Sequence, residues 1–221
     1  MPEVLIPQAA GAATPLQLVS EAGFAALPEG PLKTLAAAHD FKGQAGRLVV
    51  QPGPDGSPSR VLVGAGAEPF DPLLARGLPS RLPPGDYLVE GLPDGARADL
   101  FAVAWALGAY VFDRYKARPQ RGRARLVRPA GVDLEAAHRL VAASLLAREM
   151  VDTPAADMGP LQIETIAREI AEEAGAAVTV TAGDARLEAG YPAIHAVGRA
   201  AAPHRAPRLI EIGRASCRER V

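Results

Sequence analysis

Four histidines are the side chains of this sequence best suited to hold a metal ion or to move a proton at neutral pH. They are His39, His138, His195 and His204. None has a second histidine or a carboxylate at the spacing of a helical metal motif such as HExxH. The surrounding pattern places His138 on a helix stripe and His195 inside a strand. We therefore predict packed or hydrogen-bonded histidines rather than metal ligands.

The stretch "VGAGAEP" (63–69) could contact a phosphate, because it follows a predicted strand and has the first two glycines of a dinucleotide-binding loop. The third glycine is missing, since Pro69 stands in its place. We interpret the stretch as a tight strand exit that needs a positive φ angle. The alternative is a phosphate or nucleotide site at a helix N-terminus beside Gly64–Gly66.

Other catalytic patterns are missing from the sequence. No GxSxG nucleophile elbow occurs, and the only cysteine is Cys217, which excludes a disulfide framework and a thiolate metal site. Carboxylates do gather around Arg168 on one predicted helix; they are Glu164, Glu169, Glu172 and Glu173. Their spacing indicates a solvated face with i,i+4 ion pairs. The residues alone thus predict no catalytic, cofactor-binding or metal site.

Composition and charge exclude several classes of function. Apolar residues make up 48% of the 221-residue chain, charged residues make up 22%, and the net charge is −1. This balance gives no basic footprint for nucleic acid or for anionic lipid. The N-terminus has no secretory signal pattern, and the longest apolar run, 100–112, is shorter than the roughly 20 residues that span a bilayer. We expect a cytoplasmic protein with no nucleic-acid or membrane partner.

Helical and strand patterns alternate along the chain. Helices are predicted from Pro31, over 98–114, over 133–151 and over 160–175. Strands are predicted over 15–19, 47–51, 60–64, 85–93, 124–131, 176–183, 191–200 and 206–212, with the second and third forming an antiparallel hairpin. This alternation predicts an α/β layer architecture.

Three stretches resemble the leucyl aminopeptidase family, the dinuclear metal exopeptidases also called cytosol aminopeptidases. They are "AREMVDTPAADMGP" (147–160), "YPAIHAVGRAAAPHRAPRLIEI" (191–212) and "FKGQAGRLVVQPGPDGSPSRVLVGAG" (41–66). The sequence departs from the family pattern at Asp152 and Ala156, where asparagine is usual, and at Ala201, where serine is common.

The resemblance implies an N-terminal, macrodomain-like α/β domain over 1–132, a linker helix over 133–152 and the beginning of a second, catalytic α/β domain over 153–211. It implies a parent enzyme that removes N-terminal, leucine-type residues from peptides with two divalent ions, manganese or zinc, and that assembles as a hexamer. The glycine-rich blocks that carry the family's metal ligands do not occur in this sequence. We therefore expect this chain to hold no metal pair and to be inactive. The alternatives are a non-enzymatic nucleotide-binding module and an assembly subunit.

The last ten residues, "IGRASCRERV" (212–221), correspond to one translated reading frame of a common sequencing adapter. We interpret 212–221 as a sequencing-adapter artefact that replaces the rest of the catalytic domain. The alternative is a natural basic tail.

Overall fold

The computed structural model describes residues 4–67, 70–92, 97–116 and 123–213. The chain divides into two compact units, unit 1 over Met1–Arg148 and unit 2 over Glu149–Val221, and each unit is described by itself. The predicted artefact at 212–221 lies outside the described residues except for its first two positions.

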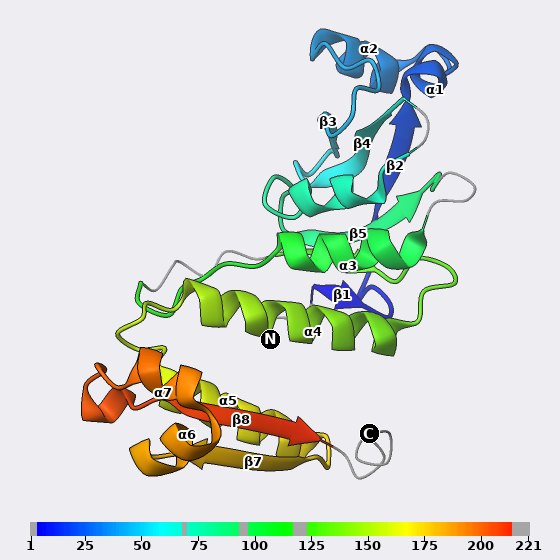
Figure 1. Ribbon diagram of the computed structural model, residues 1–221. Helices are drawn as coiled ribbons and strands as arrows, with labels where there is room; N and C mark the ends of the chain where they lie inside the picture. Colours follow the sequence, from blue (N-terminus) through cyan, green and yellow to red (C-terminus); the bar gives the residue numbers. More distant parts are fainter. Residues whose placement is uncertain (1–3, 68–69, 93–96, 117–122, 214–221) are drawn as a thin grey trace. The chain divides into compact units, whose positions relative to one another are not determined.

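Unit 1 is built on a six-stranded sheet with the order β1-β6-β5-β2-β4-β3. Figure 1 labels strands β1 to β5 of this sheet. Its strands are β1 (Leu5–Ile6), β2 (Thr14–Ser20), β3 (Leu48–Pro52), β4 (Pro58–Gly66), β5 (Gly85–Glu90) and β6 (Ala124–Val127). Neighbouring strands are parallel except for β3, which is antiparallel to β4. This confirms the predicted hairpin, and the carboxylate of Asp55 stabilises its turn by accepting from the N–H and hydroxyl of Ser57.

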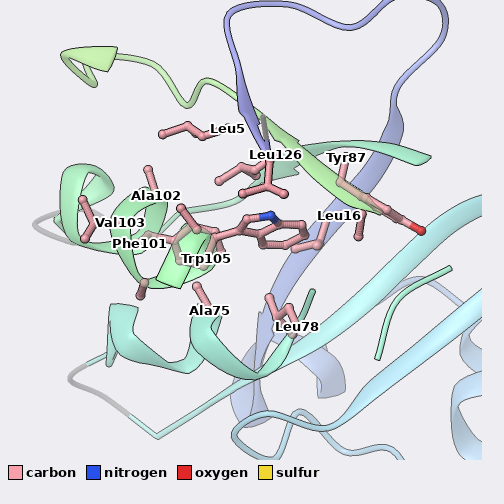
Figure 2. Packing of buried hydrophobic residues seen from close by; sticks show 14 of the residues in the cluster. Leu5, Leu16, Ala75, Leu78, Tyr87, Phe101, Ala102, Val103, Trp105 and Leu126 are labelled. Carbon is pink, nitrogen blue, oxygen red and sulfur yellow. The ribbon is translucent and has the colours of Figure 1, made fainter. Parts of the chain in front are cut away.

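One face of this sheet packs against the 3-10 helix η1 (Pro72–Gly77), α3 (Ala98–Gly108) and α4 (Leu134–Asp152). Figure 2 shows the centre of this core, where Trp105 of α3 lies beside Tyr87 of β5 with ring centroids 6.1 Å apart. Continuous burial from Phe101 to Ala106 explains why this helix is apolar on every side.

The predicted end of this helix, at 114, is wrong, because α3 ends at Gly108. Glycine has low helix propensity. A Cβ atom at Gly108 would also lie 2.0 Å from the carbonyl oxygen of Arg76. The glycine therefore permits close packing of α3 on η1 and then ends the helix.

The other face of the sheet packs against α1 (Glu21–Ala25) and α2 (Pro31–Ala38). Phe41 is fully buried there, and its ring meets Phe24 edge-on at 5.5 Å. Helices on both faces of a mostly parallel sheet confirm the predicted α/β class.

Helix α4 begins as predicted. The side chain of Asp133 accepts a hydrogen bond from the N–H of Ala136, which is the capping contact expected at a helix start. Ala137 and Val141 are its buried residues in unit 1. At its far end, Arg148 donates to the carbonyl oxygen of Leu107 at 2.7 Å.

Unit 2 combines four helical segments with a small sheet. These elements are α5 (Pro160–Glu173), β7 (Ala177–Ala182), α6 (Asp184–Gly190), α7 (Pro192–Gly198), η2 (Pro203–Arg205) and β8 (Arg208–Gly213). Strands β7 and β8 are antiparallel, with Ala177 opposite Gly213 and Ala182 opposite Arg208.

The strand predicted over 191–200 is wrong, because this segment contains helix α7. Pro192 occupies the first turn of α7, where a proline is well tolerated. At the other end, Gly198 packs so closely that a Cβ atom would lie 2.3 Å from the ring of Pro207. The β-branched residues Ile194 and Val197 favour a strand, but tertiary packing outweighs such propensities here. None of the helices in the described part of the chain is long and apolar enough to span a membrane.

Candidate functional site

The four histidines do not form a site. His39 follows α2, His195 lies in α7 rather than in a strand, and His204 lies in η2. The ring Nε2 of His138 is 3.0 Å from the carbonyl oxygen of Leu5, so it carries the proton and donates, as its packed role predicted. Across the described ranges, no group of three or more histidine, cysteine, aspartate or glutamate side chains is placed to hold a metal ion.

The glycine turn that could have bound a phosphate uses its backbone amides internally. The N–H of Gly64 donates to the carbonyl oxygen of Arg47 at 2.7 Å, and that of Gly66 donates to Gly43 at 2.8 Å. A Cβ atom on Gly64 would lie 1.9 Å from the carbonyl oxygen of Gln44. These glycines are therefore needed for close packing of the preceding loop.

The conformation at the end of β4 agrees with the tight exit predicted there, since Gly66 has a φ angle of 76°. The next described helical element is η1, a six-residue 3-10 helix rather than a long α-helix. Its first turn is already capped, because Asp71 accepts from the N–H of Leu73 at 2.9 Å. The geometry thus disfavours the nucleotide-binding alternative.

Glu164 is more enclosed than the predicted solvated helix face, with a side chain only 13% exposed. Its carboxylate pairs with Arg168 one turn along α5 and also accepts from Arg208 at the start of β8. These arginines, Arg168 first, hold the pKa of Glu164 below its usual range. Sequence spacing predicted the first pair but could not reveal the second, whose partners are 44 residues apart.

Arg205 is a second residue whose role no sequence pattern indicated. Its guanidinium donates through Nη1 to the carbonyl oxygen of Ala155 and through Nη2 to that of Ala156, the latter at 2.6 Å. Gly159 leaves room for this contact, since a Cβ atom there would lie 3.3 Å from Nη1 of Arg205. The bond uses the backbone of Ala156, so it does not require the asparagine that the family usually has at this position.

The loop that Arg205 holds, 153–159, joins α4 to α5 and is anchored at both ends. Thr153 is buried, and its hydroxyl donates to the carbonyl oxygen of Glu149 at 2.6 Å. The side chain of Gln162 accepts from the N–H of Gly159 at 3.0 Å. These contacts are structural. The described residues supply no cluster of oxygen or nitrogen ligands that would fit two divalent ions.

Comparison with known proteins assigns a family model to each unit. Residues 14–129 match the model described as "M17 aminopeptidase, N-terminal domain". Residues 145–219 match the model described as "Cytosol aminopeptidase family, catalytic domain".

Individual proteins give the same result. The chain is 30% identical over 219 residues to "Probable cytosol aminopeptidase" of Streptomyces coelicolor, an alignment that covers 82% of this chain and 41% of the relative. The crystal structure of cytosol aminopeptidase from Coxiella burnetii is similar with a TM-score of 0.82 and 26% identity, over 95% of this chain and 46% of that one.

A third similar structure is the bottromycin maturation enzyme BotP in complex with Mn, with a TM-score of 0.71 and 23% identity, over 90% of this chain and 44% of that one. At this identity the likeness shows the fold alone. In all three comparisons, the chain spans less than half the length of the protein that it matches.

Proposed function

Since the chain belongs to the M17 cytosol aminopeptidase family, we propose that the whole protein is a metal-dependent aminopeptidase that removes N-terminal, leucine-type residues from peptides. The observation that carries this proposal is the order of the family matches, with the N-terminal domain over 14–129 followed by the catalytic domain over 145–219. Similarity to the cytosol aminopeptidase of Coxiella burnetii over 95% of this chain supports it further.

We propose that the enzyme uses two divalent ions, manganese or zinc. Such ions would supply Lewis-acid chemistry, namely activation of a water molecule and stabilisation of negative charge on the peptide carbonyl oxygen, and residues outside those described here would hold them. The manganese in the BotP structure supports this choice. The residues described here do not fit a metal pair. This supports the view that the metal ligands lie in the region of the relatives that this chain does not cover.

For this chain, the proposal assigns 1–132 to an accessory N-terminal domain, 133–152 to a linker helix and 153–211 to the opening of the catalytic domain. The division between the two compact units falls after Arg148, inside the proposed linker. We further propose a cytoplasmic homo-hexamer for the whole enzyme, on the basis of the family resemblance. In this proposal, the described residues of this chain form part of the folded scaffold and supply no catalytic group.

An assay of the purified 221-residue chain tests the assignment of the metal site. With leucyl-p-nitroanilide and added Mn²⁺ or Zn²⁺, we expect no hydrolysis above the buffer blank and no saturable heat on titration with Mn²⁺. Hydrolysis that a chelator abolishes would show that the ligands lie within this chain.

A chimera tests the enzyme assignment itself. Residues 1–211 are joined to the part of the Streptomyces coelicolor relative that follows the region aligned with them. We expect hydrolysis of leucyl-p-nitroanilide that requires Mn²⁺ or Zn²⁺, with N-acetyl-leucyl-p-nitroanilide as the blocked control. A folded chimera with no such activity would refute the proposed function. For comparison, calorimetric titration of the 221-residue chain with ADP-ribose should be silent, whereas saturable heat at micromolar ligand would favour the nucleotide-binding module.

A further inference from the structure

Helix α4 is continuous, yet the division between the two compact units falls inside it, after Arg148. Before this point, the helix packs on the core of unit 1 through Ala137, Val141 and Leu145. None of residues 149–152, the rest of α4, is buried. The packing of α4 on unit 1 therefore ends near Arg148 and not at the end of the helix.

Arg148 makes two contacts with the end of helix α3. Its Nη1 donates to the carbonyl oxygen of Leu107 at 2.7 Å, and its guanidinium carbon lies 5.9 Å from the centroid of the Tyr110 ring. Leu107 lies in the last turn of α3, where an α-helix leaves its carbonyl oxygens without an i+4 partner. A cation is favoured at this negative end of the helix dipole, and the aromatic ring adds cation–π attraction.

The two contacts together require an arginine. Its planar guanidinium can donate a hydrogen bond and lie against a ring, whereas a lysine ammonium is a compact and strongly hydrated charge. Both partners of Arg148, Leu107 and Tyr110, belong to unit 1. Arg148 thus fastens α4 to unit 1 at the last residue of that unit.

We propose that Arg148 is a latch that sets where α4 leaves unit 1. With the latch closed, bending of the connection between the units is confined to the residues after 148. With the latch open, the last contact of α4 with the core is Leu145, so the flexible connection grows by about one helical turn. The inference concerns contacts within unit 1 and does not depend on the proposed function.

Amide hydrogen exchange of the 221-residue chain tests the latch in two parts of the same helix, because local opening and global unfolding are separated by this measurement. In Arg148→Ala, exchange over 145–152 should be at least tenfold faster than in wild type, while exchange over 134–141 should change less than twofold. Arg148→Lys keeps the charge but not the planar group, so exchange over 145–152 should still be at least threefold faster than in wild type.

A glutamate-specific protease provides an independent measurement, because Glu149 directly follows the latch and is the same in every variant. Under native conditions, cleavage after Glu149 should be at least tenfold faster in Arg148→Ala than in wild type, with the urea-unfolded chains as the reference for intrinsic rates. The matched control is Arg139→Ala, which removes an exposed arginine of the same helix that pairs with Glu135. Its exchange and cleavage rates should stay within twofold of wild type.

Three results would overturn the proposal. Unchanged exchange over 145–152 in Arg148→Ala would show that α4 is held without the latch. An equal acceleration over 134–141 would show that Arg148 only stabilises unit 1 as a whole. Wild-type behaviour of Arg148→Lys would show that the hydrogen bond and the ring contact of the planar guanidinium do not matter.

Discussion

The burial of Tyr87 predicts that the protein loses stability in alkali, which unfolding measurements at several pH values can detect. Tyr87 is fully buried beside Trp105, and its hydroxyl donates to the carbonyl oxygen of Pro83 at 2.7 Å. Burial raises the pKa of Tyr87 to about 12, whereas an exposed tyrosine has a pKa near 10. The folded state therefore holds the phenolic proton more tightly than the unfolded chain does.

The direction of the effect follows from this difference in proton affinity. The contribution of Tyr87 is fully present below pH ~10 and is lost as the pH rises towards 12, because the unfolded chain ionises first. At pH 11 this tyrosine is mostly ionised in the unfolded chain and mostly protonated in the folded one. Its contribution to the free energy of unfolding is therefore about 1.4 kcal/mol smaller at pH 11 than at pH 9.

The substitution Tyr87→Phe isolates this contribution. At pH 8 it should lower the free energy of unfolding by roughly 1 kcal/mol, because the carbonyl oxygen of Pro83 loses its donor. Between pH 9 and pH 11 the difference should shift by about 1.4 kcal/mol in favour of the variant, so that Tyr87→Phe becomes slightly more stable than wild type at pH 11. Urea unfolding followed by Trp105 fluorescence measures it, since this is the chain's single tryptophan and lies in the same core.

Tyr115→Phe provides the comparison at an exposed tyrosine, because Tyr115 is 54% exposed and the substitution removes no fully buried phenol. A constant difference between wild type and Tyr87→Phe from pH 9 to pH 11 would refute the reasoning. It would mean that the phenol ionises equally readily in the folded and unfolded chains.

Two further predictions concern contacts at the site. Gly64→Ala should destabilise unit 1 by about 1–3 kcal/mol, because a Cβ atom would lie 1.9 Å from a carbonyl oxygen. Gly77→Ala is the control, because a Cβ atom there meets open space, and it should change the free energy of unfolding by less than about 1 kcal/mol. Urea unfolding compares the two variants. Glu164→Gln should lower the free energy of unfolding by roughly 1–2 kcal/mol near pH 7, whereas Glu135→Gln, at a side chain that is 85% exposed, should be nearly neutral. The lowered pKa of Glu164 means that its contribution is present above the usual carboxyl pKa and disappears in acid as the pH falls through the lowered value. Hydrogen exchange in α5 measures this, and an equal cost at pH 3 and pH 7 would contradict it.

Local patterns predicted those elements whose stability is decided locally. Three such features specify their structure within a few residues. They are the turn between β3 and β4, the cap at Asp133 and the helix start at Gly159 and Pro160. The strand predicted over 191–200 was wrong because its β-branched residues favour a strand, while Pro192 and the close packing of Gly198 on Pro207 accommodate a helix.

Long-range contacts limit how much of the candidate site could be predicted from the sequence. Arg205 reaches the carbonyl oxygens of Ala155 and Ala156 across about 50 positions of sequence, and such acceptors have no side-chain signature at all. Arg208 likewise meets Glu164 because β8 pairs with β7 and α5 packs against both strands. These two arginines fix the loop 153–159 and the start of β8. Both contacts join segments that are far apart in the sequence, so no local pattern could have indicated either arginine.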